Sequence, residues 1–248
     1  MLLTISPMLL VRLLVPLFFL TPATPPPALS CMTKYYGIIA ELTDGAWTAR
    51  VGDTRIPYDD KKTKTADEKL EHPDVKDVFT PRYRTGPIRP VTDPDEDPGR
   101  TRLDAIFRAV FPTKDLVRID FVGHKVQVHK RAQAAFERVA ARLKALVAAD
   151  AKLAPFVARL GGTFNARNIA GTDRPSAHSY GIAIDLNDKL SDYWRWEKNG
   201  WKNKIPQPIV DAFEAEGFIW GGRWFHFDTM HFEYRPELLD GSCYAPAP

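Results

Sequence analysis

The sequence predicts an α+β fold in which a small antiparallel sheet is flanked by helices. Three segments have apolar residues at helical spacing and several shorter ones alternate between apolar and polar residues, but the two kinds follow no regular βαβ order. The composition, 44% hydrophobic and 26% charged over 248 residues, is that of a globular protein and excludes a disordered chain. A chain of this length can bury a core without a structural metal, so we expect any bound metal to serve chemistry.

The predicted helices are segments in which apolar residues recur every three or four positions. Pro112 ends the first pattern, because proline cannot continue a helix. The third pattern begins after Pro206 and Pro208 and ends at Gly217, which we expect to cap it. These helices are predicted over residues 103–111, 130–149 and 209–216.

Strands are expected where apolar and polar residues alternate. Residues 117–128 predict a strand or a hairpin that turns at Gly123 and His124. Another strand is expected over residues 163–169, after a pair of glycines that ends the preceding helix. The remaining predicted strands cover residues 182–187 and 230–234.

The first thirty residues have the layout of an export signal. They contain no acidic residue and one basic residue, Arg12, ahead of an apolar run that ends at Leu20 and is followed by small residues and prolines. Arg12 and Pro16 interrupt the run well short of the ~20 apolar residues that a membrane span needs. We therefore predict that residues 1–30 direct export to the periplasm or cell envelope, and that the mature chain has no membrane span.

The two cysteines lie near the ends of the predicted mature chain. Cys31 directly follows the leader, and Cys243 is near the C-terminus. In an oxidising compartment they can form a disulfide that joins the two ends. The alternative is a lipid on Cys31, but residues 28–30 fit a lipoprotein signal poorly, so we favour the disulfide.

The rest of the mature chain divides by composition. Residues 31–100 are polar and end in a segment rich in proline and glycine, which predicts a loop-rich N-terminal arm wrapped on a domain of residues 101–248.

The formal net charge of +3, with no dense basic cluster, excludes nucleic acid as a partner. We expect the mature protein to be a monomer.

Two segments near the C-terminus hold side chains that can bind a metal. Residues 176–187 contain His178 and Asp185, and His231 lies further on with Asp228 three residues before it. Imidazole nitrogens and carboxylate oxygens are ligands that zinc accepts, and three protein ligands leave a coordination position open for catalysis. The chain has no HExxH motif, which excludes a thermolysin-like site.

The spacing of His178 and Asp185 requires a turn between them. In one extended strand, seven residues would hold the two side chains more than ~20 Å apart, too far for one ion. Gly181 is the expected turning point, because glycine adopts positive φ without cost. We therefore expect His178 on a loop before the strand and Asp185 within it, on the face opposite Ile182, Ile184 and Leu186.

Each of these residues also has an ordinary structural explanation. A histidine is more often packed in a core or hydrogen-bonded at the surface than bound to a metal. We assign such roles to the other histidines: His72, His124, His129 and His226. Five of the six tryptophans fall between residues 194 and 224, where they can pack the core or line a cleft.

The motifs, taken in order, resemble those of a known family. The patterns Ser-x-His-x-x-Gly-x-Ala-x-Asp at 176–185, Trp-Gly-Gly-x-Trp at 220–224 and Asp-x-Met-His-Phe-Glu at 228–233 are similar to those of the zinc D-alanyl-D-alanine carboxypeptidases and the related L-alanyl-D-glutamate endopeptidases of phage lysins. The resemblance covers residues 155–240. It implies the zinc peptidase fold that this family shares with the hedgehog signalling domain, and one zinc ion per chain.

The resemblance also implies a role for each matching residue. His178, Asp185 and His231 match the family's zinc ligands. Asp228 matches the carboxylate that serves as general base.

Two further positions match residues that bind substrate. Arg167 matches an arginine that helps to bind and polarise the substrate, although a salt bridge with Asp173 is the structural alternative. Ser176 matches a serine that hydrogen-bonds the substrate. Arg223 departs from the pattern, because many relatives have an acid at that position, and this leaves the detailed specificity open.

Together these roles predict an exported zinc metallopeptidase that hydrolyses the stem peptides of peptidoglycan, with Asp228 as the base for a zinc-activated water. D-Ala-D-Ala carboxypeptidase and L-Ala-D-Glu endopeptidase activities both remain open. The alternative from another class is a non-catalytic, zinc-containing binding module of the hedgehog type. A base beside the metal, together with Arg167, favours the enzyme. A third alternative, a leaderless lysin, is disfavoured by the apolar N-terminal segment.

Overall fold

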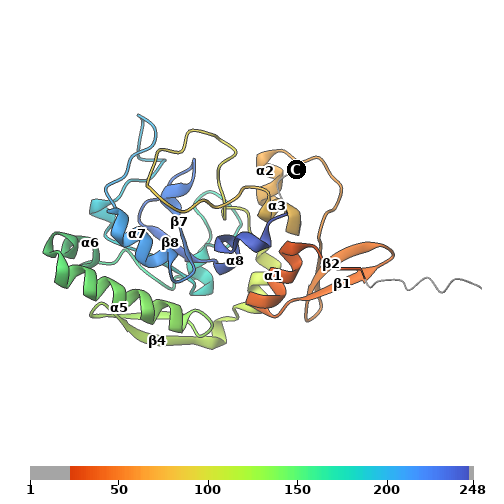
Figure 1. Cartoon of the computed structure of the whole chain (residues 1–248), viewed down its shortest axis with the longest axis horizontal. Helices are drawn as coiled ribbons and strands as arrows, with labels where there is room; N and C mark the ends of the chain where they lie inside the picture. Colours follow the sequence, from red (N-terminus) through yellow and green to blue (C-terminus); the bar gives the residue numbers. More distant parts are fainter. Residues whose placement is uncertain (1–22, 246–248) are drawn as a thin grey trace, which may run out of the picture.

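A three-stranded antiparallel sheet lies at the centre of the C-terminal part of the chain in the computed structural model, which describes residues 23–245 (Figure 1). Its strands run in the order β6 (Ala183–Asp185), β8 (His231–Tyr234) and β7 (Phe218–Trp220). The register of β6 on β8 sets Asp185 directly opposite His231. Strand pairing alone therefore brings together two residues that are 46 positions apart in the chain.

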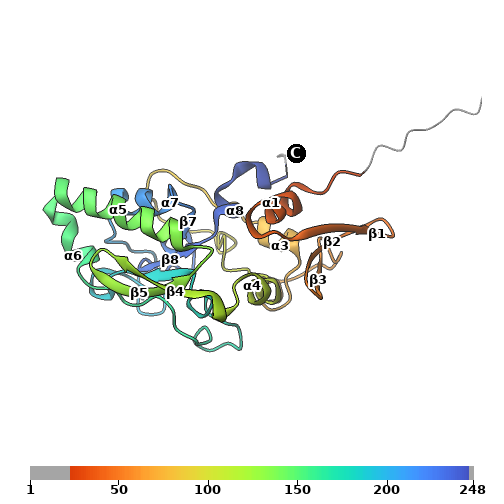
Figure 2. The same cartoon turned by 90° about the horizontal axis from the view of Figure 1, so that it is seen from below.

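Two helices and a hairpin pack in succession beside this sheet (Figure 2). α7 (Gln207–Glu214) packs on β7, and α5 (Gln133–Ala149) packs on α7 and on the hairpin. Aromatic rings make the junctions: Phe213 of α7 stacks on Phe232 of β8 with centroids 3.9 Å apart, and Phe136 of α5 meets Phe218 of β7 at 4.7 Å. The predicted α+β architecture, with small antiparallel sheets and helices, is confirmed.

The hairpin consists of β4 (Leu116–Phe121) and β5 (His124–His129). Its turn lies one residue earlier than predicted, at Val122 and Gly123, which both have positive φ (50° and 86°). His124 is therefore the first paired residue of β5, opposite Phe121. At the other end of β5, the backbone N–H of His129 donates to the carbonyl of Gly181 at 2.7 Å, which ties the hairpin to the loop ahead of β6.

The N-terminal segment contains more regular structure than its composition predicts. A helix, a three-stranded antiparallel sheet in the order β1-β2-β3 and two short helices lie within residues 27–79 and so occupy most of the predicted arm. The longest stretch of the described chain without helix or strand is residues 80–103. The description of residues 31–100 as loop-rich is therefore wrong for residues 31–79, whose short strands form an exposed sheet with little apolar alternation. The elements are α1 (Pro27–Tyr36), β1 (Ile39–Thr43), β2 (Ala46–Val51), β3 (Thr54–Pro57), α2 (Ala66–Glu71) and α3 (Val75–Phe79).

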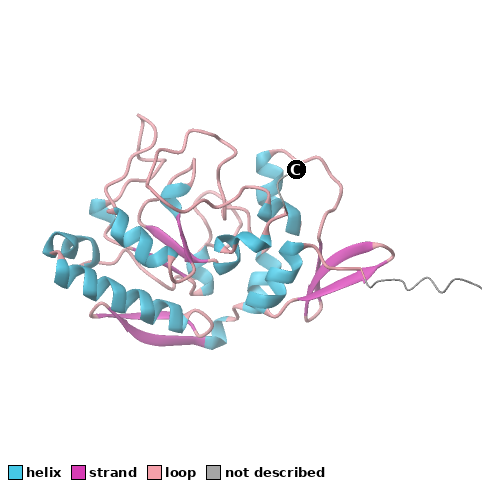
Figure 3. Ribbon diagram, in the orientation of Figure 1, coloured by secondary structure: helices cyan, strands magenta, loops and turns pink. Residues whose placement is uncertain are grey.

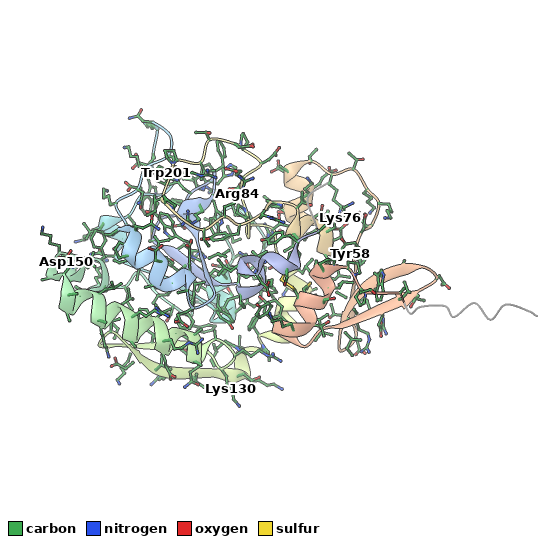
Figure 4. All side chains as sticks on the ribbon, in the orientation of Figure 1. Tyr58, Lys76, Arg84, Lys130, Asp150 and Trp201 are labelled. Atoms are coloured by element: carbon green, nitrogen blue, oxygen red, sulfur yellow. A yellow bond between two sulfur atoms is a disulfide. The ribbon has the colours of Figure 1, made fainter. Side chains whose placement is uncertain are left out.

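The predicted disulfide is present and joins the two ends of the described chain (Figure 4). Cys31 in α1 is bonded to Cys243, with their Cα atoms 5.4 Å apart, so no thiol remains at Cys31 for a lipid. Beside it, Lys34 contacts Asp240 at 2.8 Å. The bond fastens α1 to the segment that follows α8 (Pro236–Leu239).

Residues 1–22 of the predicted leader lie outside the described residues. The last residues assigned to it, however, form the first turn of α1, where Ala28 and Leu29 are buried in the core. A leader boundary at residue 30 would cut this helix, so a boundary ahead of Pro27 fits the fold better. None of the helices within residues 23–245 combines the length and apolar character needed to cross a membrane.

Three other boundaries differ from the sequence prediction. Residues 163–169 form one isolated bridge, between Asn168 and Pro175, and no strand, because the chain there wraps around the loop that carries His178. α7 ends at Glu214, and Gly217 lies beyond its cap, at φ 89° in the turn into β7. β7 itself was not predicted. The remaining helices are α4 (Asp104–Val110), within the expected range, and α6 (Ala154–Val157).

We predict that Leu29→Ala lowers the free energy of unfolding by about 2–4 kcal/mol, because Leu29 is fully buried and its truncation leaves a cavity. Urea denaturation of the disulfide-bonded protein measures this change. Ile39→Ala, at an exposed position of β1, is the control and should change stability by less than about 0.5 kcal/mol. Equal midpoints for Leu29→Ala and the parent protein would show that the residues ahead of Cys31 are not part of the folded unit.

Candidate metal centre and substrate cleft

The three predicted ligands converge on one point. Oδ1 of Asp185 lies 3.2 Å from Nε2 of His178 and 3.0 Å from Nδ1 of His231, and these two nitrogens are 3.2 Å apart. A tetrahedral zinc ion with ligands at ~2.0–2.1 Å holds its donor atoms ~3.3 Å apart, so the spacing fits one ion. The two-histidine, one-carboxylate donor set also fits zinc.

A short turn positions His178. Ala177–Tyr180 form a 3₁₀ turn that begins at Ser176, whose Oγ accepts from the N–H of His178 at 3.4 Å. The turn ends at Gly181, at φ 67°, where a Cβ would lie 2.9 Å from the backbone nitrogen of His129. Only glycine satisfies both the conformation and the close approach. The chain thus turns where expected, with His178 before the strand and Asp185 at its end.

Each histidine has its second ring nitrogen engaged by an acceptor. Nδ1 of His178 lies 2.6 Å from the carbonyl oxygen of Thr163 and donates to it. Nε2 of His231 lies 3.4 Å from Oε2 of Glu233. When both rings are neutral, these contacts leave Nε2 of His178 and Nδ1 of His231, the two atoms that face Asp185, with lone pairs for an ion.

Glu233 is itself held by two arginines. Its carboxylate is fully buried and contacts Nη1 of Arg235 at 3.1 Å and Nη1 of Arg102 at 3.4 Å. Burial opposes ionisation, but Arg102 and the other positive groups outweigh it and hold the pKa of Glu233 at about 2. Arg102 also donates to the carbonyl of Pro175 at 2.7 Å, and so contacts both segments that carry the ligands.

The contacts of Glu233 and Arg102 were not predicted from the sequence. Glu233 is part of the motif at 228–233, but the motif indicates no role for it. No signal in the sequence links Arg102 to a motif more than 70 residues away.

The charge of the cluster is set by close contacts. Burial lowers the pKa of His231, but its hydrogen bonds with Asp185 and Glu233 outweigh burial and raise it to about 10. Burial also disfavours the Asp185 carboxylate, yet His178 and His231 keep the pKa of Asp185 well below its usual range. Without an ion, the site is therefore a protonated His231 beside an ionised Asp185.

Asp228 lies next to this cluster with one oxygen unsatisfied. Its Oδ1 is buried and has no hydrogen-bond partner among the described residues. Burial and the neighbouring Asp185 raise the pKa of Asp228 to about 7. A buried carboxylate with a free oxygen and a pKa near neutrality is suited to accept and return a proton.

The pair of glycines ahead of Asp228 is explained by close packing. A Cβ on Gly221 would lie 2.4 Å from the carbonyl oxygen of Asp228, and one on Gly222 would lie 2.1 Å from the ring of Trp220. A side chain at Gly221 would displace the segment that carries Asp228, and one at Gly222 would displace the Trp220 ring. The Trp-Gly-Gly motif therefore serves the geometry of the site.

A cavity of about 810 Å³ opens onto the three ligands and Asp228. Arg167 and Ser176 line it on the side of the metal cluster. Its other walls come from α2, from residues 94–102 and from residues 193–196. Figure 3 shows loops gathered along the upper edge of the view, above the central sheet. The N-terminal segment thus forms part of the cleft and is more than a scaffold.

The two predicted substrate-binding residues differ in their surroundings. Arg167 is exposed, and its guanidinium makes one long contact, 3.5 Å, with the carbonyl of Asn168. It forms no ion pair with Asp173 or any other acid within residues 23–245, so its charge is available to a ligand. Ser176 is buried, and the contact observed for its hydroxyl is the one that starts the His178 turn.

Arg223, the departure from the family pattern, lies outside the cavity lining. It forms a buried ion pair with Glu214, with Nε to Oε1 at 2.6 Å and Nη2 to Oε2 at 3.2 Å. Tyr83 donates to the same carboxylate at 2.6 Å. Arg223 therefore has a structural role, in a buried ion pair outside the cavity.

The histidines given structural roles lie outside the metal cluster. His226 lines the cavity, but its Nδ1 is bound by Asp97 at 2.6 Å. The others have structural positions: His72 caps the C-terminal end of α2, His124 contacts the Val157 carbonyl at 3.2 Å, and His129 packs against Phe111.

With this geometry in place, one comparison with known proteins is informative. Residues 170–234 match the family model described as D-alanyl-D-alanine carboxypeptidase. The match covers about a quarter of the chain and implies a peptidase that acts on cell-wall peptides. It includes the three candidate ligands and Asp228, and leaves out Arg167 and Arg102. No solved structure matches the chain, so the hedgehog-like fold stays a prediction.

We predict that zinc binding at pH 7 releases at least about one proton, because His231 has a pKa of about 10 without the ion and must lose its proton to bind it. Calorimetric titrations in two buffers of different ionisation enthalpy measure the release. His72→Ala, which removes an exposed histidine at the end of α2, should leave it unchanged. A binding heat independent of the buffer would contradict the assigned charge of the cluster.

We predict that Arg102→Ala weakens zinc binding by about 10–100-fold, because it frees both Glu233 and the Pro175 carbonyl. Competition with a chromophoric chelator gives the zinc Kd. Arg108→Ala, at an exposed position of α4, is the matched control and should keep the parental Kd. An unchanged Kd for Arg102→Ala would remove Arg102 from the support of the metal centre.

Proposed function

We propose that the protein is an exported zinc peptidase that hydrolyses peptide bonds in the stem peptides of peptidoglycan. The observation that carries this proposal is the position of Asp228. Its buried, unpartnered oxygen lies beside a convergent two-histidine, one-aspartate cluster at a cavity. The family match supports the same class of substrate.

Each residue of the site has a part in the proposed reaction. His178, Asp185 and His231 would hold the zinc ion, which when bound would supply Lewis-acid activation of a water molecule and of the scissile carbonyl. Asp228 accepts a proton from the attacking water and gives it to the departing amine, for which a pKa near 7 is suited.

Charge at the substrate carbonyl requires a separate donor. Arg167, with no acidic partner, donates to the carbonyl oxygen as it becomes negative, or to a substrate carboxylate. The Ser176 hydroxyl, which already accepts from His178, can still donate its proton to the substrate. A module that only binds its ligand would have no use for the buried base, and this disfavours the non-catalytic alternative.

The proposed location is the periplasm or cell envelope. A disulfide between Cys31 and Cys243 persists in oxidising compartments, and the apolar N-terminal segment supplies the export signal. Peptidoglycan peptides are accessible there.

We predict that Asp228→Asn retains zinc but lowers kcat by about 10²–10⁴-fold, because the amide cannot accept a proton. For the parent protein, the rate should fall with decreasing pH as Asp228 becomes protonated, at or below its pKa of about 7, and the variant should lose this dependence. Rates are measured by mass analysis of D-Ala-D-Ala and L-Ala-D-Glu stem peptides.

The matched control is Asp173→Asn, which neutralises an exposed carboxylate in the same part of the chain, outside the cavity lining. It should retain the parental rate and pH profile. Undiminished turnover by zinc-loaded Asp228→Asn would rule out Asp228 as the base.

A further inference from the structure

One wall of the cavity carries aromatic side chains that the proposed reaction does not use. The rings of Trp196, Tyr193, Trp194 and His226 follow one another in edge-to-face contact, with centroid separations of 5.2, 6.1 and 4.7 Å. All four side chains line the cavity that contains the candidate metal centre. We call these four residues the aromatic row.

The outer end of the row is exposed to solvent. Trp196 is 60% exposed, more than any other large apolar side chain within residues 23–245. By contrast, Trp220 and Trp224 are buried. Single exposed apolar residues are common on surfaces, but this indole lies at the wall of a cavity and continues a line of rings that leads inward. Such a surface is suited to a ligand with an apolar face.

The row is fixed relative to the proposed base. Tyr193 and Asp228 form an antiparallel bridge, and backbone bonds flank it between Trp194 and Phe227 (2.9 Å) and between Thr229 and Asp192 (3.0 Å). The N–H of Trp196 donates to the Tyr193 carbonyl at 2.9 Å, which closes a turn beneath the exposed indole.

A second contact anchors the same loop further along. Trp201, labelled in Figure 4, donates its Nε1–H to the Gly222 carbonyl at 2.9 Å. The exposed indole is therefore preorganised, and a ligand that stacks on it loses little of its binding energy to ordering the protein.

The chemistry of the proposed substrate indicates which of its parts can bind the aromatic row. The alanyl and glutamyl residues of the stem peptide have small or acidic side chains that offer little to an indole face. The stem is joined to a glycan, whose pyranose rings present a face of C–H bonds. These hydrogens are attracted to the electron-rich face of an aromatic ring.

Polar groups for the edge of a sugar ring are also present. The exposed guanidinium of Arg195 lies 5.0 Å over the ring of Trp194. Lys69 and Asp95 line the same cavity from the N-terminal segment. The cavity that contains the aromatic row therefore also offers donors and acceptors, as recognition of hydroxyl and amide groups on a sugar requires.

We propose that the aromatic row is a glycan subsite, in which the Trp196 indole stacks on a pyranose ring of the sugar that carries the stem peptide. This assignment rests on the proposed function, since it names the non-peptide part of the same substrate. It makes the protein selective for peptides still attached to sugar.

The test compares one stem peptide with the same peptide attached to its disaccharide. The parent protein should have a kcat/KM at least about tenfold higher for the sugar-bearing peptide, mainly through a lower KM. Trp196→Ala should lose this preference and keep the parental turnover of the free peptide, which also shows that the variant is folded. Trp196→Phe should retain most of the preference, because it keeps an aromatic face.

Leu42→Ala is the control, because it truncates another exposed apolar side chain, on β1 and outside the cavity lining. Its preference should be parental. Equal kcat/KM of the parent protein for the two substrates, or a full preference retained by Trp196→Ala, overturns the glycan subsite.

A binding measurement separates this proposal from the proposed function. The zinc-free parent protein should bind the sugar-bearing peptide at least about tenfold more tightly than the free peptide in calorimetric titrations, and Trp196→Ala should bind the two equally. If neither peptide is cut but this difference holds, the peptidase proposal fails and the glycan subsite stands. If both are cut without any difference in binding or rate, the reverse is true.

Discussion

The pairing of Asp185 with His231 across β6 and β8 is the constraint on which the rest of the site depends. Residues opposite each other in an antiparallel pair have their Cβ atoms ~4.5–5.5 Å apart, so the register alone brings a carboxylate to an imidazole. A slip of one strand by one residue would turn its side chains to the other face of the sheet and separate Asp185 from His231. The stacked Phe213 and Phe232 rings behind β8 oppose such a slip, because they would lose their packing.

Around this pair, charged side chains are buried away from water and are stabilised by fixed partners of opposite charge. Glu233 and Arg235 are fully buried, and their ionised forms are stable because each has an opposite charge within about 3–3.5 Å. Oδ1 of Asp228 is not compensated in this way, since it has no hydrogen-bond partner among residues 23–245. A buried oxygen without a hydrogen bond lowers the stability of the fold. Such groups occur at functional sites.

The sequence indicated the convergence of His178, Asp185 and His231 through their donor chemistry and the family resemblance. The turn at Gly181 followed from the spacing of His178 and Asp185. The exposed sheet of β1 to β3 was missed because its strands are short and almost none of their residues is fully buried. The contacts of Arg102 and the aromatic row depend on loops that only the fold brings to one cavity, and no local pattern encodes them.

The central claim is that this cluster holds a zinc ion that activates hydrolysis of stem peptides. The most direct measurement is the rate of stem-peptide hydrolysis by the metal-free protein before and after addition of one equivalent of zinc. The account predicts no product without zinc and recovery of activity when one ion per chain is bound. Undiminished hydrolysis by the metal-free protein, or none by the fully zinc-loaded protein, would contradict it.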